Sequence, residues 1–575
     1  MTRTDSTQTR LSKGLARKTC GLSVAIALAF GASTAASAGE VYTHHVREVV
    51  HSNLAQQVSS LPASKMMNLD IVLPLRDKAG LDAFVADVTN PNSLNYQHYI
   101  TPKEFTARFG PTRNDYDTVV QYLQHYGFSV TGGSRDGMDI QVSGPVSAVE
   151  AAFNLKMRSY KHPTENRMFY SPDREPTTSL AIPLWHVSGL DNYSIPKPLY
   201  VKKSDYAAAH GISPEAVVSH ATTGSGPSAS FLGSDMRAAY YGGTALTGKG
   251  QNLGLLEFYG TDLNDLATYY KNAHQTRTVP ITLLSTDGTS TACLASQSCD
   301  DTEQTLDMTQ ALGMAPGLAS LTMYVGSTDT AMISKMTTHS PLPTTIGCSW
   351  GWTPADPTTL DPYFEKMIAQ GQTFFAASGD ASTWSASNEA WPADDAYVIS
   401  VGGTDLVTTR AAGPWKSETA WVDSGGGISP DKIAIPSWQK ITGVINTNNK
   451  GSKIYRNGPD VSANANFTFY VCADQTTCTA NSYGGTSFAA PMWAGFVALI
   501  NQQRVADSKK RIGNFNAAVY PENEAGGKLT TTYATDFHDI TSGKSGSFSS
   551  VVGYDLVTGW GSPKAGLITT LVNSP

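Results

Sequence analysis

The stretch YGGTSFAAPMWAGFVALINQQ, residues 483–503, places a serine at the start of an apolar helical pattern. Gly484 and Gly485 permit a tight turn with close backbone approach before Thr486 and Ser487. Ser487 is therefore expected at a helix N-terminus, where its backbone N–H and the helix dipole would favour a developing oxyanion. A plain serine N-cap is the simpler alternative.

A nucleophilic Ser487 would need a base to take its proton, and no histidine is an obvious candidate. Residues 231–575 contain three histidines, His274, His339 and His538. None lies in a His-Gly-Thr-His segment of the kind that a subtilisin uses, so each is expected to be structural. A carboxylate can replace imidazole as the base when its proton affinity suits the working pH.

The segment DDTEQTLDMTQALG, residues 300–313, supplies two candidate carboxylates. Asp300 or Asp301 is expected to cap a helix. Glu303 and Asp307, four residues apart, would then share one face of it. Like charges at this spacing repel, and the pair is tolerated when the two carboxyls share a proton. The alternative is that Glu303 only serves the helix dipole and Asp307 is solvated.

A third acid follows the apolar strand pattern QTFFAAS, which runs into Ser378-Gly379-Asp380. In subtilisins the corresponding strand ends in an asparagine that donates a hydrogen bond to the oxyanion. An ionised aspartate cannot donate, but a protonated Asp380 can, and an acidic medium would keep its proton in place. A turn residue without a catalytic role is the alternative.

Length and composition indicate a globular protein with more than one domain. The chain has 575 residues, of which 40% are apolar and 15% charged, with 51 glycines. These values fit a loop-rich extracellular protein and argue against a disordered or coiled-coil chain. The net charge of -7 argues against nucleic acid as a partner, because that would require a concentrated basic surface.

Residues 1–38 predict a signal peptide. A positive flank around Arg17 precedes an apolar run from Leu22 to Phe30, and Ala36-Ser37-Ala38 offers a small-residue cleavage site. Export to the extracellular space or the periplasm is the expected consequence. The apolar run is too short for a permanent anchor, so no membrane association is expected after its removal.

Residues 39–200 predict a separate unit of strands and helices. The strand patterns are LDIVLPL, MDIQVSG and LKMRSY, and helical spacing appears at Leu81–Val88, Tyr116–Leu123 and Ser147–Asn154. This order fits a sheet with helices on one face, the split βαβ type. Residues 201–230 read as a linker that is open to proteolysis, and a maturation cut is expected anywhere from Asn192 to Ser230.

The second unit predicts a parallel sheet. Short apolar runs alternate with helical patterns: NLGLLEF, LTMYVG, TTIGCSW, QTFFAAS and YVISVGG. Continuous apolar strands separated by helices indicate a sheet covered on both faces. Active residues gather at the carboxyl ends of the strands in such sheets.

The cysteines predict two local disulfides in an oxidising compartment. Cys293 with Cys299, and Cys472 with Cys478, would each close a short loop. Cys348 is expected to be a buried apolar thiol rather than a nucleophile, because no histidine lies near it in sequence.

Taken together, these segments resemble the sedolisin family of serine-carboxyl peptidases. YQHYITPKEF resembles the family's pro-domain, and TALTGKGQNLGLLEFYG, EQTLD, SWGW, ASGD, SVGGTD, SGGGIS, RNGPDVSA and YGGTSFAAP follow in family order. The resemblance implies a subtilisin-like α/β domain with a seven-stranded parallel sheet over residues 231–575. It also implies an α+β, ferredoxin-like pro-domain over residues 39–200 that acts as intramolecular inhibitor and chaperone.

The resemblance also implies roles for single residues. Ser487 would be the nucleophile, Glu303 the general base and later acid, and Asp307 the residue that orients Glu303. Asp380 would be the oxyanion-hole acid. The implied activity is that of an acid-acting, pepstatin-insensitive endopeptidase that matures itself and acts as a monomer on protein or peptide substrates.

Family members bind one calcium ion near the carboxyl terminus, and HDITSGKSGSFSSVVGYDLVTGWGSP offers matching positions. Oxygen ligands of the kind that Ca²⁺ prefers would be the carboxylates of Asp539 and Asp555 and the main-chain carbonyls of Ile540, Val551 and Gly553. A Gly/Ser-rich surface loop without a metal is the alternative.

Two other functions remain open. Some relatives remove tripeptides from free amino termini, which keeps the fold and changes the substrate. A catalytically silent secreted binding protein is a third possibility, against which the four catalytic-type residues Glu303, Asp307, Asp380 and Ser487 argue.

Overall fold

The computed structural model describes residues 39–217, 223–388 and 390–575, which belong to one compact unit. The predicted signal peptide, residues 1–38, lies outside the described residues. Within the described part of the chain, no helix has the length and apolar character needed to cross a bilayer.

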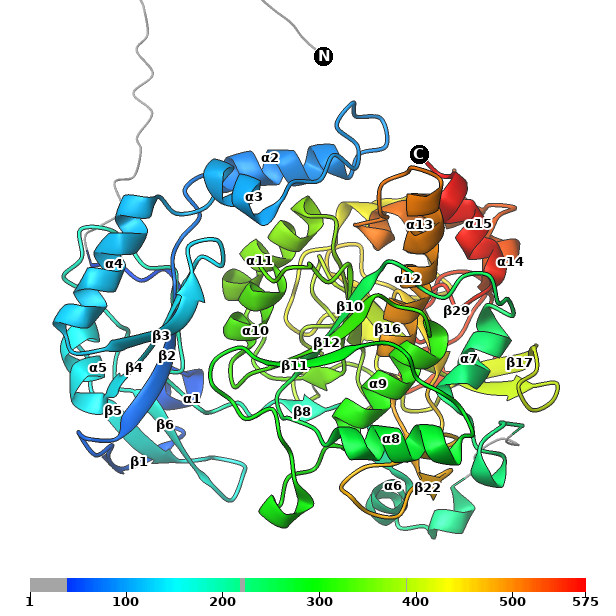
Figure 1. Ribbon diagram of the computed structural model, residues 1–575, viewed down its shortest axis with the longest axis horizontal. Coiled ribbons are helices and arrows are strands. Elements are labelled where there is room, and N and C mark those ends of the chain that lie inside the picture. The colour runs from blue at the N-terminus through cyan, green and yellow to red at the C-terminus, as the bar shows by residue number, and fades with distance from the viewer. Residues whose placement is uncertain (1–38, 218–222, 389) are drawn as a thin grey trace, which may run out of the picture. The chain divides into compact units, whose positions relative to one another are not determined.

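The amino-terminal part of the described chain forms an antiparallel sheet with helices packed on it (Figure 1). The strand order is β3 (Ser129–Ser134), β4 (Asp139–Pro145), β2 (Met66–Val72) and β7 (His186–Ser188). Helices α4 (Arg113–His125) and α5 (Val146–Phe153) bury apolar side chains in one cluster with strands β2 and β4. This agrees with the predicted α+β pro-domain.

A second large sheet lies in the carboxyl-terminal part of the described chain. Among the described residues seven of its strands run parallel, and β17 (Trp415–Ala420) pairs antiparallel with β16. The parallel strands are β11 (Ile281–Ser285), β12 (Ser320–Val325), β10 (Asn252–Glu257), β13 (Thr345–Cys348), β15 (Thr373–Ala377), β16 (Ile399–Thr408) and β20 (Val461–Asn464). The predicted seven-stranded parallel sheet is confirmed, with one antiparallel edge strand added.

Helices cover both faces of this sheet, as the continuous apolar strands predicted (Figure 1). Helices α9 (Thr302–Met314) and α12 (Ala489–Ala506) pack on one face, in a cluster with Leu253 and Leu255 of β10. Helices α10 (Asp329–Met336) and α11 (Pro357–Ala369) pack on the other face, against Leu256. Strand β10 thus alternates its side chains between two apolar clusters.

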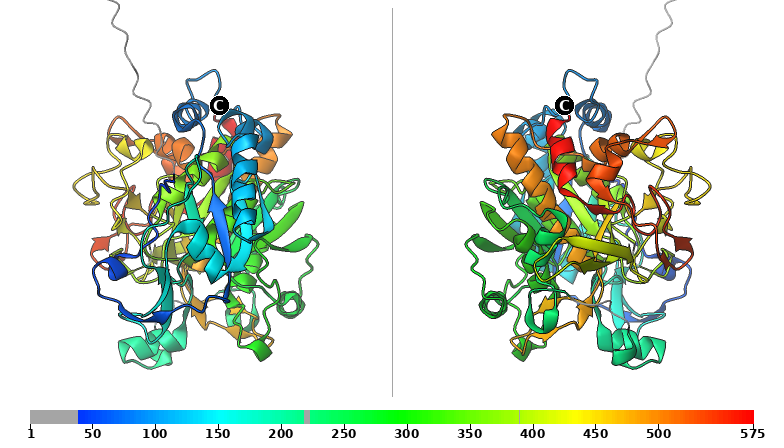
Figure 2. Two further views of the ribbon diagram at one scale, coloured as in Figure 1. Left: turned by 90° about the vertical axis from the view of Figure 1, so that its left-hand side faces the viewer. Right: turned by 90° about the vertical axis from the view of Figure 1, so that its right-hand side faces the viewer.

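The carboxyl-terminal helices belong to the same layer as α12. Helix α15 (Ala565–Asn573) buries Leu567 and Leu571 in the cluster that also holds the apolar side chains of α12. The side view in Figure 2 (right) shows these red and orange helices together on one side of the sheet.

The linker differs from its prediction. Residues 197–202 form two short strands, β8 (Lys197–Pro198) and β9 (Val201–Lys202), and α6 (Lys203–His210) follows. Helix α6 ends at Gly211, whose φ of +65° a side chain would disfavour. Ala207 is buried in a small cluster with Trp421, so tertiary packing orders a segment that its composition marked as irregular.

The cysteine predictions are confirmed. Disulfides join Cys293 to Cys299 and Cys472 to Cys478. Cys348 is free and fully buried at the end of β13, and burial raises the pKa of its thiol well above the usual value. A protonated, enclosed thiol has no nucleophilic role.

Candidate active site

Ser487 lies where a short 3₁₀ turn, residues 486–488, leads into α12. It is fully buried, and its Oγ donates a hydrogen bond to Oε2 of Glu303 at 2.9 Å. Gly485 precedes this turn with φ of +136°, a conformation that disfavours side chains. The chain therefore turns sharply into the helix and leaves the serine hydroxyl pointing at a carboxyl.

Glu303 and Ser487 meet because α9 and α12 lie against each other on one face of the sheet. Gly495 makes the close approach possible, since a Cβ there would stand 2.9 Å from the carbonyl oxygen of Ala311. Glu303 is in the first turn of α9, and Ser487 directly precedes α12. The two helix N-termini converge beyond the carboxyl ends of the parallel strands, where α/β proteins commonly place their sites.

Glu303 is one of three buried carboxyls in contact. The carboxyls of Glu303 and Glu257 both lie within hydrogen-bond reach of Asp307, and Ser349 Oγ donates to Asp307 Oδ1 at 2.7 Å. Burial, with the charges of Asp307 and Glu257, raises the pKa of Glu303 well above its usual value. Burial likewise raises the pKa of Asp307 to about 8. The three carboxyls therefore titrate as one coupled set rather than as separate groups.

Glu257 was missed in the sequence. It ends strand β10 and is fully buried, and its Oε2 accepts a hydrogen bond from the indole N–H of Trp350 at 3.0 Å. The signal was present, because Glu257 is the one charged residue in the apolar run NLGLLEF at the carboxyl end of a parallel strand. Burying a carboxyl there without a function would be costly.

Asp380 follows strand β15 and faces the turn that carries Ser487. Its Oδ1 accepts hydrogen bonds from the backbone N–H and the hydroxyl of Thr486, both at 2.8 Å. Its Oδ2 is enclosed and has no hydrogen-bond partner among the described residues. Burial raises the pKa of Asp380 to about 8, so a proton on Oδ2 is favoured at acidic and neutral pH.

Two of the three histidines in residues 231–575 have contacts away from Ser487. His339 Nδ1 lies 2.8 Å from the hydroxyl of Tyr324, and the ring of His538 stacks on Trp415 with centroids 4.0 Å apart. Their structural roles, expected from the sequence, agree with these contacts. Glu303 occupies the place beside Ser487 that a base would need.

A segment of the chain itself lies against Ser487. Strand β8 pairs antiparallel with β14 (Trp350–Gly351), and β9 pairs antiparallel with β23 (Tyr483–Gly484). Leu199, between the two, accepts a hydrogen bond from the backbone N–H of Ser487 at 3.0 Å. The peptide chain therefore crosses the site in extended form.

The five positions predicted to hold calcium lie in a folded carboxyl-terminal loop. Asp539 Oδ1 accepts hydrogen bonds from the hydroxyl of Tyr533 at 2.9 Å and the N–H of Gly553 at 3.1 Å. Asp555 is fully buried, and its Oδ2 accepts the N–H of Val551 at 3.0 Å. Asp539 is thus joined to the same loop that ends in Asp555.

The calcium site stays a prediction that rests on the residue types. Two carboxylates and nearby main-chain carbonyls, including that of Ile540, are the oxygen ligands that Ca²⁺ takes. Burial raises the pKa of Asp555 to about 7, and its carboxylate accepts hydrogen bonds from the backbone N–H groups of Val551, Val557 and Thr558. Within the described residues, no cluster of three or more His, Cys, Asp and Glu side chains suits a metal. Main-chain ligands would therefore have to complete the site.

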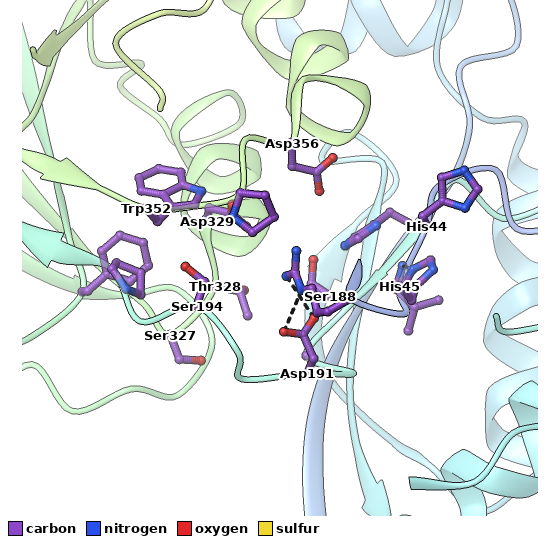
Figure 3. Close-up of a pocket in the computed structure, with 17 residues that line it drawn as sticks. His44, His45, Ser188, Asp191, Ser194, Ser327, Thr328, Asp329, Trp352 and Asp356 are labelled. Atoms are coloured by element: carbon purple, nitrogen blue, oxygen red, sulfur yellow. Dashed lines mark hydrogen bonds and ion pairs between the residues drawn. The ribbon is translucent and has the colours of Figure 1, made fainter. Parts of the chain in front are cut away.

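A separate pocket is lined by both parts of the chain (Figure 3). Figure 3 shows His44, His45 and Asp191 across the pocket from Asp329 and Asp356. The other titratable residues at its wall are Arg47, whose guanidinium pairs with Asp191 at 3.0 Å, and His186. None of the four predicted catalytic residues lines this pocket.

Comparisons with known proteins agree with this architecture. Residues 53–193 match the family described as "Pro-kumamolisin, activation domain", and residues 270–515 match the "Subtilase family". Kumamolisin of Bacillus sp. (strain MN-32) is 28% identical over 558 residues, covering 91% of this chain and 94% of the relative. Sedolisin of Pseudomonas sp. (strain 101) is 26% identical over 601 residues, covering 96% and 95%.

A shorter similarity extends to another activity. Tripeptidyl-peptidase 1 of Rattus norvegicus is 30% identical over 228 residues, which is 36% of this chain and 39% of the relative. The matches that extend over most of the chain are to kumamolisin and sedolisin. The chain therefore joins a pro-kumamolisin activation domain to a subtilase-like, serine-type peptidase domain, and kumamolisin and sedolisin are similar to it over most of its length.

Proposed function

We propose that the protein is an exported, acid-acting serine-carboxyl endopeptidase that is made as a self-processing zymogen. The observation that carries this proposal is the contact of Ser487 Oγ with Glu303 Oε2 at 2.9 Å, with a peptide carbonyl at the Ser487 N–H. Glu303 thus stands where histidine stands in other serine peptidases. The pro-domain acts as an intramolecular inhibitor, because its carboxyl-terminal extension fills the cleft.

The acids supply proton transfer. With one proton missing from the buried set, Glu303 takes the proton of Ser487 as the hydroxyl attacks the substrate carbonyl, and later returns it to the leaving amine. Asp307 fixes the orientation of the Glu303 carboxyl and shares its charge. Glu257 positions Asp307 from the other side.

Two donors stabilise the oxyanion. The backbone N–H of Ser487 is one, and a protonated Oδ2 of Asp380 is the other. Deprotonation of Asp380 would remove a donor and place a second negative charge beside the oxyanion. The pKa of about 8 for Asp380 applies to the zymogen, in which residues 197–202 lie against Ser487. Once the segment leaves, water reaches Asp380 and its pKa falls, so the mature enzyme requires a more acidic medium.

An endopeptidase is favoured over a tripeptidyl-peptidase by the path of the segment in the cleft. The chain continues on both sides of Leu199 and pairs with a wall strand on each side. A site that removes tripeptides would have to end the cleft three residues before the cut. A peptide with a blocked amino terminus tests this, since an endopeptidase cuts it and a tripeptidyl-peptidase leaves it intact.

The central test is self-processing of the full-length protein. Purified wild type should shorten at pH 4, whereas Ser487→Ala and Glu303→Ala should stay intact. A matched control is Ser482→Ala, a nearby serine outside the catalytic contacts. Equal shortening of wild type and Ser487→Ala would contradict the proposal, because an outside protease or a silent binding protein would then explain the data.

Calcium is proposed as a structural ion held by Asp539 and Asp555 and the carbonyls of Ile540, Val551 and Gly553. The ion would clamp the carboxyl-terminal loop and would take no part in peptide hydrolysis. We also propose that the mature enzyme works as a monomer on protein or peptide substrates outside the cytoplasm.

A further inference from the structure

We infer that Leu199–Tyr200 is the bond that the enzyme cuts first on itself, and that residues 197–202 are the template for its preferred substrates. This inference rests on the proposed function. The segment is held as a substrate would be, in extended form with a strand on either side. Strand β8 pairs antiparallel with β14, with Pro198 opposite Trp350 and Lys197 opposite Gly351.

The other side of the bond is held in the same way. Strand β9 pairs antiparallel with β23, with Lys202 opposite Tyr483 and Val201 opposite Gly484. Strand pairing on both walls fixes the register of the segment, because a shift by one residue would turn every side chain to the opposite face. The Leu199–Tyr200 bond therefore lies at the centre of the segment that the two strand pairs hold.

The hydrogen bonds of Leu199 identify the scissile carbonyl. Its N–H donates to the carbonyl oxygen of Ser349 at 2.9 Å, and its own carbonyl accepts the N–H of Ser487 at 3.0 Å. An oxyanion formed at Leu199 would thus already lie against a donor of the nucleophilic turn.

Gly485 brings the second donor into the same place. A Cβ on this residue would stand 2.6 Å from the Leu199 carbonyl oxygen and 2.7 Å from both Oδ2 of Asp380 and Cα of Tyr200. The carbonyl oxygen, the unpartnered carboxyl oxygen and the residue after the cut therefore surround one small space. Only glycine leaves that space open.

The residues around the bond define a substrate class. The Leu199 side chain is 7% exposed and packs in the main apolar cluster, so an aliphatic residue is favoured before the cut. The Tyr200 hydroxyl donates to Asp300 Oδ2 at 3.1 Å, and its ring meets Tyr483 edge-on at 5.8 Å. Lys202 Nζ lies 3.6 Å from the same carboxylate oxygen.

Asp300 and Tyr483 therefore form a subsite for a tyrosine directly after the cut and a basic residue two positions further on. Burial pushes the pKa of Asp300 upward, but hydrogen bonds from Thr302 and the charge of Lys202 hold it below the usual value. An ionised Asp300 suits both a phenol donor and an ammonium group.

The reaction at this bond is balanced by one water molecule. Ser487 Oγ bonds to the carbonyl carbon of Leu199 while its proton passes to Glu303. The carbon–nitrogen bond breaks as Glu303 gives that proton to the nitrogen of Tyr200. Water then attacks the ester, its proton returns through Glu303 to Ser487 Oγ, and Leu199 leaves as a carboxyl terminus. The new chain begins at Tyr200.

The test is the mass and amino-terminal sequence of the first large fragment after the full-length zymogen is moved from neutral pH to pH 4. We expect this fragment to begin at Tyr200 at the earliest times. Leu199→Asp should slow this cut at least ~10-fold, the size of effect that one changed group in an apolar subsite produces. Ile212→Asp, the same change at an exposed linker residue, should leave the rate unchanged.

A peptide assay keeps the inference testable if Leu199→Asp fails to fold. Mature enzyme should cut a peptide with both ends blocked and the sequence Lys-Pro-Leu-Tyr-Val-Lys between Leu and Tyr, and should cut the version with Asp for Leu at least ~10-fold more slowly. A first fragment that begins elsewhere in wild type, while Ser487→Ala stays intact, overturns this inference and leaves the proposed function standing. If Ser487→Ala is processed as fast as wild type, the proposed function itself is wrong.

Discussion

The indole N–H of Trp350 donates a hydrogen bond to the Glu257 carboxyl at 3.0 Å, and Glu257 in turn lies in hydrogen-bond reach of Asp307. Glu303, the proposed base beside Ser487, is thereby supported by a series of buried groups on its far side. In the proposed mechanism Glu257 acts through Asp307 and is a positioning residue, so its removal should affect orientation and proton sharing rather than binding.

Glu257→Gln should lower kcat by about 10- to 100-fold, the cost of a misplaced catalytic group, with KM nearly unchanged. The pH–rate profile should also change, because one proton site is lost from the coupled set. Steady-state kinetics on a blocked peptide from pH 3 to 7 would measure both. Trp350→Phe, which removes only the indole donor, should give a smaller effect of the same kind. A lower kcat with an unaltered profile would mean that Glu257 is only structural.

Asp380→Asn should keep the oxyanion donor and abolish its titration. The amide oxygen can accept from Thr486 as Oδ1 does, and the amide nitrogen can donate where protonated Oδ2 stands. In the proposed mechanism wild-type activity should be lost as pH rises through the pKa of Asp380, since this acid donates only while protonated. The ratio of activity at pH 7 to that at pH 4 should therefore rise in Asp380→Asn.

Asp380→Ala is the comparison variant for Asp380→Asn, because it loses the oxyanion donor. Removing one oxyanion donor costs about 100- to 1,000-fold in kcat, and this loss should be seen at every pH. Identical pH–rate profiles for wild type and Asp380→Asn would contradict the proposed role of Asp380.

Asp300→Ala should weaken preference for tyrosine after the cut. A hydrogen bond to Asp300 contributes about 0.5–1.5 kcal/mol, so kcat/KM for a Leu-Tyr peptide should fall about 2- to 10-fold. The matching Leu-Phe peptide lacks the hydroxyl, and its kcat/KM should change little in the same variant. Equal losses for both peptides would place Asp300 outside this subsite.

Calcium removal should lower thermal stability more than it alters chemistry. Mature enzyme treated with a chelator at pH 5 should show a lower Tm, and added Ca²⁺ should restore it by mass action. Asp555→Asn should show a low Tm that Ca²⁺ does not raise. A Tm that is indifferent to chelator and to Ca²⁺ in the wild type would rule out the proposed ion.

His186 should contribute to release of the pro-domain in acid. Its ring stacks on His45 with centroids 4.6 Å apart, and its Nδ1 lies 3.3 Å from the hydroxyl of Thr359 in α11. Burial, with the nearby His45 and Arg47, lowers the pKa of His186 well below 6.5. The other charged groups around this pair are Glu175, Asp191, Asp329 and Asp356.

The direction of this pH effect follows from the uptake of a proton on release of the pro-domain. In the zymogen His186 stays neutral, whereas the released pro-domain exposes it and binds a proton below its ordinary pKa of about 6.5, so falling pH favours release. His186→Gln should shift the pH of half-maximal self-processing downward while leaving the pH–rate profile of mature enzyme on peptides unchanged. His125→Gln, at an exposed position of α4, is the control. Equal midpoints for all three proteins would exclude this contribution.

Local sequence predicted the regular parts of the molecule well. Apolar runs such as NLGLLEF gave the parallel strands, and the four-residue spacing of Glu303 and Asp307 placed both on α9. Their closeness to Ser487 depended on a family resemblance, because no local pattern specifies which helices become neighbours. Glu257 is a single charged residue in an otherwise apolar strand, and no local pattern links it to Glu303 and Asp307.

The linker shows why the rest was not predictable. Strands β8 and β9 have two residues each, too short for any periodicity, and they exist only because wall strands 150 and 280 residues away accept them. Helix α6 has an alanine-rich core that favours a helix, but the surrounding Pro, Gly and Ser composition obscured it.

Lys197 and Pro198 pair with β14, and Leu199 follows them directly. This pairing offers a starting point for inhibitor design. A synthetic tripeptide with this sequence and an aldehyde in place of the leucine carboxylate would present its carbonyl to the Ser487 hydroxyl in the register already adopted by the chain. The resulting hemiacetal would be reversible, and its occupancy would report directly on whether the serine is competent to attack.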